Sequence, residues 1–376
     1  MPPLHLAARE GQVDCCVLLL QRNAPAEGRD AHGRTPLMLA LEHGHSECAN
    51  TLIPHCTNLD ATCHLKQPSL HRAAMRGLTA PVALMLTRGV DVCATDGRGR
   101  TALHVACASG EPSVAMQIVS SGPNGRRCLD MIDAVGSTPA LCAARLAYLT
   151  PKRRTAQLHC VATCILLGAD CSAEAAAVTT AAAAAYAQSA SASEEAVGVA
   201  LMGTPPHGKD REPTEVSRHS SGGETGGSAV AAAAAAGGAG GLLPLHFYLA
   251  ALDATDLLLQ VVERLVRSPT SPAGTQAGRA PAATVPSPKE TAPPRLLRAR
   301  PLDAKSCGGF TVLHFAAAHG AVGSVRLLLA HGAVSDIPDA NGELASDYAL
   351  RGVPGVCLPG AGHAECHQML MRHLAR

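Results

Sequence analysis

Two kinds of apolar block alternate along most of the chain, with polar turns between them. The first kind is short and rich in Ala, as in LHLAARE from Leu4. The second kind carries larger apolar side chains, as in VDCCVLLL from Val13 and VRLLL from Val325. Because Ala pairs such as Ala7 and Ala8 let neighbouring helices approach closely, we interpret each pair of blocks as two short packed helices. The pattern therefore predicts an all-α fold.

The pairs of blocks recur with one fixed period. His5, His71 and His104 are spaced by 66 and 33 residues, and Met38 fills the position between the first two. Four glycines keep the same 33-residue period without a slip: Gly11, Gly44, Gly77 and Gly110. A single pair of helices cannot bury both of its faces, so such units become stable only by stacking on their neighbours.

Residues at the edges of the first block suit the ends of a helix. Thr35 and Thr101 precede the block, where a hydroxyl accepts hydrogen bonds from the free N–H groups of the first turn. Pro36 takes the first helical position, where its missing N–H costs nothing. The glycines after the block suit the left-handed conformation that ends many helices.

A 33-residue unit with T-P-L-H-x-A-A and a Gly six residues after the His resembles the ankyrin repeat. The resemblance implies an ankyrin-repeat solenoid, built from helix-turn-helix units with short hairpin turns. It also implies that the motif His ties the start of its own helix to the backbone of the adjacent turn, and that the Gly ends the helix. The residues in these roles are His5, His71, His104, His246 and His314, with Gly11, Gly44, Gly77, Gly110 and Gly320.

Two low-complexity stretches interrupt the repeats. The expected organisation is repeats 1–5 over residues 1–171 with an insertion at about 149–158, an Ala/Ser/Gly-rich disordered linker at 172–241, repeat 6 at 242–266, a Pro/Ala/Ser-rich disordered loop at 267–300, a turn and repeat 7 at 301–342, and a C-terminal capping repeat at 343–376. One continuous solenoid is favoured over two tethered arrays, because closing a long loop costs little more than closing a short one. The first unit lacks the preceding turn, so it is either an abbreviated cap or the chain begins farther upstream.

Composition narrows the function classes. Aromatic residues make up 2% of the chain, so the core must be built from Ala, Leu, Val and Cys. The net charge of +1 gives no general attraction to nucleic acid or to an anionic membrane, and the longest apolar run carries charged residues. With 15 cysteines and no secretory signal, we expect reduced thiols in a cytoplasmic monomer. Nuclear localisation stays open, because PKRR from Pro151 is a short basic stretch.

The cysteines raise the alternative of a metal site. One loose group is His159, Cys160, Cys164 and Cys171, and another is Cys56, Cys63 and His64. The repeat register instead places Cys15, Cys48 and Cys160 at a core position of the second helix, and neither group has the paired C-x-x-C spacing of a zinc site. The sequence holds no nucleotide-binding, hydrolase or metalloprotease motif. We therefore expect no cofactor, no metal and no enzymatic activity.

By the resemblance, the concave side of the stack is lined by the turn residues around the motif's Asp and Gly and by the two residues before the helix-ending Gly. These positions hold Arg29, His32, Arg34, Glu42 and His43, then His64, Gln67, Met75 and Arg76, then Arg98, Arg100, Ala108 and Ser109. Five arginines stand against one carboxylate in this set, so we expect the N-terminal half to bind an acidic or phosphorylated partner segment through guanidinium groups. The alternative is that the arginines only keep the surface soluble.

The C-terminal half differs in the same register. Lys305, Phe310 and His319 face the groove there, followed by Pro338, Asn341 and Glu343, so charge is mixed and Phe310 is a candidate anchor for an apolar side chain. The predicted function is a non-catalytic scaffold or adaptor for protein partners, with no role in binding nucleic acid or membrane. The alternative is a subunit that delivers its partner to a ligase, kinase or phosphatase complex.

Overall fold

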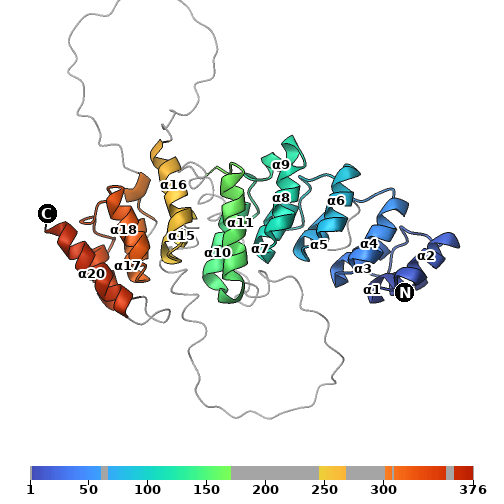
Figure 1. Ribbon diagram of the computed structural model, residues 1–376, viewed down its shortest axis with the longest axis horizontal. Coiled ribbons are helices and arrows are strands. Elements are labelled where there is room, and N and C mark those ends of the chain that lie inside the picture. Colours follow the sequence, from blue (N-terminus) through green and yellow to red (C-terminus); the bar gives the residue numbers. More distant parts are fainter. Residues whose placement is uncertain are drawn as a thin grey trace, which may run out of the picture.

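The computed structural model describes residues 2–60, 67–170, 245–267, 301–306, 309–352 and 360–375. Its helices form a single row of pairs, with α1 (Pro3–Glu10) and α20 (Ala361–Leu374) at opposite ends (Figure 1). The described residues contain no strand beyond an isolated bridge between Thr95 and Thr101. The all-α repeat fold expected from the sequence is therefore confirmed.

The helices lie in two layers, one made of the first helix of each unit and the other of the second helix. The first-helix layer comprises α1, α3 (Pro36–His43), α5 (Ser69–Met75), α7 (Ala102–Ser109), α10 (Pro139–Leu149), α15 (Leu245–Ala251), α17 (Val312–Ala318) and α19 (Ala345–Arg351). The second-helix layer comprises α2 (Val13–Gln21), α4 (Ser46–Leu52), α6 (Thr79–Thr87), α8 (Pro112–Ser120), α11 (Arg154–Leu166), α16 (Thr255–Arg267), α18 (Val322–Ala330) and α20. Short helical turns accompany them: η1 (Ile53–His55), α9 (Pro123–Arg127), η2 (Pro151–Arg153) and η3 (Pro301–Asp303).

Within each layer, every helix packs against the same helix of the next unit. Contacts run without a break from α1 on α3 to α17 on α19, and from α2 on α4 to α18 on α20. This regular stacking supplies the burial that one helix pair lacks.

Capping groups start and end the first helices. The Thr35 hydroxyl accepts a hydrogen bond from the Met38 N–H, and Thr138 accepts one from Leu141. Gly44 ends α3 with a φ of 84°, a left-handed conformation that a side chain would strain. Helix α3 is therefore held to about two turns.

Small side chains fill the core between the layers. Ala73, Ala74, Ala106, Ala143 and Ala144 have no exposed surface. A methyl group on each helix lets the backbones approach closely, and burial of apolar surface stabilises the stack by roughly 25 cal/mol per Å². One connected set of buried residues runs from Leu4 in the first unit to Leu370 in the last.

Unit 6 stacks directly on unit 5. Helix α10 packs on α15 and α11 packs on α16. The Tyr148 and Tyr248 rings meet edge to face, with centroids 6.0 Å apart, and Arg264 Nη2 donates to the Ile165 carbonyl at 2.6 Å. The described units therefore form one row, although α11 and α15 are far apart in the sequence.

The insertion in unit 5 is largely helical. Helix α10 has 11 residues, whereas α3 and α7 have 8, and η2 and the first turn of α11 follow it. The second helix of this unit begins at Arg154 rather than at His159. Its added first turns pack on the array, since Gln157 is buried and donates to the Ala108 carbonyl at 3.0 Å. Arg267, expected to begin the second loop, is instead the last residue of α16. The rest of the two expected disordered stretches, residues 172–241 and 268–300, lies outside the described residues.

Candidate functional site

The motif histidines link each unit to the next. In four units, His Nε2 lies within hydrogen-bond distance of a backbone carbonyl in the following turn: His5 of Arg34 at 3.1 Å, His71 of Arg100 at 2.8 Å, His104 of Ser137 at 2.9 Å and His314 of Glu343 at 3.2 Å. Burial lowers the pKa of His71, His104 and His314, which favours the neutral ring. These four rings lie in different units and contact different turns, so they do not converge on a common point.

His246 differs from the other motif histidines. Burial lowers its pKa to about 4, and its Nε2 has no hydrogen-bond partner among the described residues. The segment that follows its unit in the sequence, 268–300, lies outside the described residues.

A second set of side chains ties the units at the ends of the first helices, and the sequence reasoning missed it. His45 Nε2 lies 2.9 Å from the Arg9 carbonyl, and His363 Nε2 lies 3.2 Å from the Ala318 carbonyl. A side chain at Gly11 or Gly320 would collide with these rings. The signal that these histidines share is G-H-x-E, which occurs as GHSE from Gly44 and as GHAE from Gly362.

Two of the predicted groove arginines are paired with aspartates in their own turns. Arg34 Nη2 lies 2.9 Å from Asp30 Oδ2, and Arg100 Nη2 lies 2.8 Å from Asp96 Oδ2. Burial alone would raise the pKa of Asp96, but hydrogen bonds from the Arg100 guanidinium and backbone outweigh it and lower that pKa. The pKa of Asp30 is lowered by the same balance with Arg34. These arginines thus hold the turns in shape.

Glu42 is shared by two arginines. Its Oε2 lies 2.7 Å from Arg72 Nη1 and 3.5 Å from Arg34 Nη1. Arg72 is buried on α5, so this contact joins neighbouring units. The count of five arginines against one carboxylate is therefore incomplete, because Asp30, Asp96 and Arg72 belong to the same face. Adding these three residues to the predicted set gives six arginines against three carboxylates, and the ion pairs of Arg34, Arg72 and Arg100 balance much of that charge within the chain.

We call the turns before the first helices, together with the last residues of those helices, the turn face. Its exposed members among the predicted residues are Arg29, His32, His43, Arg76 and Arg98. Its half-buried members are Gln67, Met75, Ala108 and Ser109. Arg29 Nη1 donates to the Gly33 carbonyl at 3.3 Å, and the His43 ring stacks near His45 with centroids 6.3 Å apart. His64 lies outside the described residues.

The predicted residues of the C-terminal half make contacts within the array. The half-buried Phe310 ring packs edge to face on Tyr348, with centroids 5.4 Å apart. His319 uses both ring nitrogens, with Nε2 2.7 Å from Tyr148 Oη and Nδ1 2.8 Å from the Phe315 carbonyl. Lys305 Nζ donates to the Pro338 carbonyl at 2.8 Å. Asn341 is exposed and Glu343 pairs with Arg351, so charge is mixed at this end.

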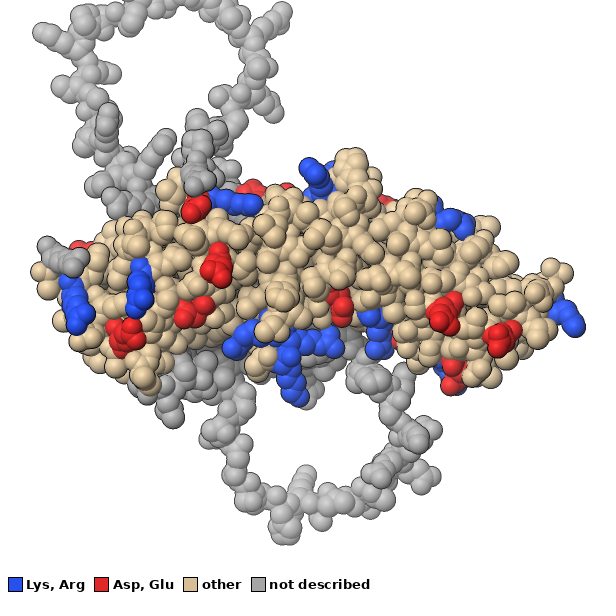
Figure 2. All heavy atoms as spheres, viewed as in Figure 1, with Lys and Arg blue, Asp and Glu red and all other residues tan. Residues whose placement is uncertain are grey.

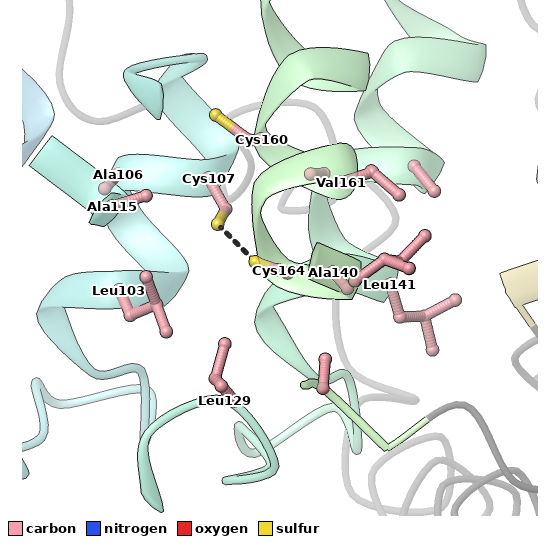
Figure 3. Close-up of a cluster of buried hydrophobic side chains, with 14 of the residues drawn as sticks. Leu103, Ala106, Cys107, Ala115, Leu129, Ala140, Leu141, Cys160, Val161 and Cys164 are labelled. Atoms are coloured by element: carbon pink, nitrogen blue, oxygen red, sulfur yellow. Dashed lines mark hydrogen bonds between the residues drawn. The ribbon is translucent and has the colours of Figure 1, made fainter. Parts of the chain in front are cut away.

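The cysteines lie mainly in the core. Cys107 and Cys164 point toward one another across α7 and α11, with their sulfur atoms 3.6 Å apart (Figure 3). Hydrogen bonds between the Cys107 thiol and the sulfur atoms of Cys160 and Cys164, together with burial, raise the pKa of Cys107 well above its ordinary value. Cys48 and Cys160 are buried as expected, but Cys15 is exposed, because the described chain has no unit stacked outside α2.

The structure also bears on the alternative metal site. Cys63, His64 and Cys171 lie outside the described residues. Within the described ranges, no three His, Cys, Asp or Glu side chains form a group that would hold a metal ion. No helix in those ranges is long and apolar enough to cross a membrane.

Comparison with known families identifies the repeat. The family described as "Ankyrin repeats (3 copies)" matches residues 1–64, and the family described as "Ankyrin repeat" matches residues 308–340. The chain is an ankyrin-repeat protein. The first family match lies at the start of the row of helix pairs and the second covers the pair α17 and α18, and the units between them continue the same two layers.

Related ankyrin sequences occur in proteins of different kinds. The chain is 31% identical over 112 residues to a transient receptor potential cation channel subfamily A member 1 homolog of Caenorhabditis elegans, covering 30% of this chain and 9% of that protein. It is 39% identical over 85 residues to the probable E3 ubiquitin-protein ligase XBOS33 of Oryza sativa, covering 22% of this chain and 16% of that protein. The chain thus spans only a small part of the curated relatives that it matches.

A solved structure resembles part of this ankyrin-repeat chain. It is the crystal structure of an ankyrin repeat domain from Acinetobacter baumannii, with 24% sequence identity and a TM-score of 0.40. The match covers 45% of this chain and 82% of the other.

Proposed function

We propose that this protein is a non-catalytic scaffold or adaptor that binds a segment of a partner protein along its turn face. Ankyrin repeats imply protein–protein interaction, which agrees with this proposal. The observation that carries it is that structural side chains and exposed polar side chains occupy different places in each unit. Motif histidines and most described thiols are held in buried structural contacts, whereas exposed polar residues line the turn face in successive units.

In the N-terminal half, the proposed partner segment is acidic or phosphorylated. Arg29, Arg76 and Arg98 are exposed there, and planar guanidinium groups suit bidentate contacts with carboxylate or phosphate oxygens. The pairing of Arg34 and Arg100 with aspartates leaves this half of the turn face modestly rather than strongly cationic. Binding is therefore expected to weaken with added salt.

Site-specific photo-crosslinking in cell lysate tests the proposal. A photoreactive amino acid replaces the exposed His43 on the turn face in one full-length protein and the exposed Met116 on α8 in the control. The proposal predicts that the same partner proteins are crosslinked repeatedly from position 43 and not from position 116. Equal crosslinking from both positions would exclude the turn face as a specific binding surface.

The alternative function is delivery of a partner to an enzyme such as a ligase, kinase or phosphatase. Similarity to a probable E3 ubiquitin-protein ligase favours it, although the match covers 16% of that protein. Delivery requires a second docking site outside the turn face. Removal of residues 172–241 is then expected to release an enzyme complex while crosslinking from position 43 persists.

A further inference from the structure

The insertion in unit 5 carries a run of cations that the turn-face pattern does not include. Lys152 and Arg153 end η2, and Arg154 begins α11. All three side chains are exposed. We call these three residues the basic ledge. In Figure 2, basic side chains gather at the lower edge of the middle of the molecule, which is where α10 and α11 meet in Figure 1.

The position of the ledge is electrostatically unfavourable in the chain by itself. The amino end of a helix carries partial positive charge and prefers acidic residues, yet the first turn of α11 holds no acidic residue. Among the described residues, none of the three ledge cations forms an ion pair. Burial raises the pKa of the nearby Glu111, and the positive charge of Arg153 opposes that rise without forming an ion pair with it. An anionic ligand would relieve this repulsion.

Backbone contacts fix the ledge beside the turn face. Arg153 Nη1 donates to the Ser109 carbonyl at 2.9 Å, at the end of α7. Arg154 Nε donates to the Ala147 carbonyl at 3.2 Å. A guanidinium group has five N–H donors, so each arginine is anchored by one donor while others stay available to a ligand. The ledge therefore continues the row that Arg76 and Ser109 occupy at the ends of the first helices.

The charge around the ledge favours a short ligand over an extended polyanion. The whole chain has a net charge of only +1. Acidic side chains lie on the same side of the molecule on both flanks of the basic group (Figure 2). A long nucleic acid or a flat anionic membrane would meet these carboxylates, whereas a segment with a few consecutive carboxylates would reach the ledge alone.

We propose that Lys152, Arg153 and Arg154 bind a Glu- or Asp-rich segment of a partner protein whose remaining length lies along the turn face. This proposal rests on the proposed function and adds a second contact with acidic residues of the partner, in unit 5 beside the turn face. The arginines chelate carboxylates in a bidentate manner, and Lys152 adds a point charge.

Fluorescence anisotropy with the full-length protein tests the ledge. The probe is a fluorescein-labelled hexaglutamate peptide, with a hexaglutamine peptide, a uridine-rich single-stranded RNA and phosphatidylserine vesicles as the other arms. The ledge variant is Lys152→Gln/Arg153→Gln/Arg154→Gln. The matched control is Arg22→Gln/Arg126→Gln/Arg127→Gln, which removes the same charge from exposed residues after α2 and on α9.

The ledge variant is expected to bind hexaglutamate about tenfold more weakly than wild type, and the control variant less than about twofold more weakly. Because both variants lose the same charge, this difference would show the loss of charge-assisted hydrogen bonds. Hexaglutamine is expected not to bind. Equal loss in both variants, unchanged binding by the ledge variant, or ledge-dependent binding of RNA or vesicles tighter than that of hexaglutamate would overturn the proposal.

A second variant distinguishes loss of the binding site from misfolding of the protein. Lys152→Glu leaves the backbone contacts of Arg153 and Arg154 in place, because they do not involve Lys152. It must also weaken hexaglutamate binding while circular dichroism stays unchanged. If position 43 crosslinks partners but ledge variants bind hexaglutamate normally, only the ledge proposal fails. If the ledge binds the probe but position 43 crosslinks nothing specific, the proposed function fails instead.

Discussion

Tyr148 Oη lies 2.7 Å from His319 Nε2, so a side chain of unit 5 contacts unit 7 across the intervening unit 6. His319 Nδ1 lies 2.8 Å from the Phe315 carbonyl and must donate there, which leaves Nε2 as the acceptor for the tyrosine hydroxyl. The contact exists because α10 is longer than the usual first helix. It fixes three units at once, on either side of the junction between α10 and α15.

A double-mutant cycle on this pair is expected to show coupling. Tyr148→Phe removes the hydroxyl, and His319→Phe removes its acceptor while keeping an aromatic ring. Each single change is expected to lower the free energy of unfolding by about 0.5–1.5 kcal/mol, and the double change to cost less than the sum. Urea unfolding followed by circular dichroism measures the three values. Strict additivity would show that the pair does not contribute to stability.

The buried His246 predicts a loss of stability in mild acid. Its pKa is about 4 in the folded chain against an ordinary value of 6.5, because burial disfavours the charged ring. The unfolded chain therefore takes up the proton first as pH falls, so the stabilisation is complete above pH 6.5 and is lost between pH 6.5 and about 4. One such proton changes the free energy of unfolding by about 1.4 kcal/mol per pH unit.

His246→Leu is expected to make that pH slope shallower. The substitution removes the titrating group and a buried Nε2 that has no partner among the described residues, so stability near pH 7 should stay similar or rise. Urea unfolding at pH 5 and pH 8 measures the slope, and the exposed His55→Gln serves as the control. A wild-type slope in His246→Leu would contradict the assignment.

The Arg100 pair with Asp96 is predicted to be structural rather than available to a partner. Arg100→Gln removes a charge-assisted contact to a carboxylate whose side chain is 5% exposed, so a loss of about 1.5–3 kcal/mol in unfolding free energy is expected. The exposed Arg76→Gln should change stability by less than about 0.5 kcal/mol. Similar effects of both changes on thermal unfolding at pH 7 would count against this distinction.

The same pair also has a predictable pH dependence. Because the pKa of Asp96 is lowered in the folded chain, its contribution is present above the ordinary value of 3.8 and is lost as pH falls through the folded-state pKa. The stability difference between wild type and Arg100→Gln is therefore expected to shrink below pH 3.8. A difference that stays constant in acid would exclude an ionic contribution.

Thiol labelling is expected to separate the cysteines into two classes. Among the described cysteines, Cys15 is exposed and Cys93 is half-exposed, whereas the rest are buried. Burial raises the pKa of Cys16 and Cys128 to about 12 and that of Cys56 to about 11, which lowers their thiolate fraction further. After reduction, maleimide labelling with peptide mapping should modify Cys15 and Cys93 before the other described cysteines. Early labelling of Cys128 or Cys160 would contradict the described packing.

The repeat fold was predictable because residues that recur at a fixed spacing indicate that the same structural unit recurs. The 33-residue spacing of His5, His71 and His104 and of the glycines follows from the identical task of each residue in each unit. Stacking contacts join neighbouring units only, so knowledge of one unit extends to the next. The same reasoning led to the turn face, although its ligand stays a proposal.

Contacts between units were harder to predict from the sequence. The arginine count overlooked Asp30 and Asp96 because they were read as turn-forming residues rather than as partners of Arg34 and Arg100. Tyr148 and His319 are separated by 171 positions, and no periodic signal connects them. The basic ledge was read as a short import motif, since its place beside the turn face depends on the helical start of α11.

Stacking across the gap between α11 and α15 has a consequence for how the chain withstands cleavage. Side-chain contacts between units 5 and 6, including the bond from Arg264 to the Ile165 carbonyl, hold that junction together without help from the peptide chain that joins them. Severing the covalent connection between these helices turns their contact into an association of two molecules, so the stability of the junction then depends on the concentration of the fragments. At sufficient concentration the two fragments should reassemble when mixed, and the protein would behave as a complementing pair with a split point at unit 5.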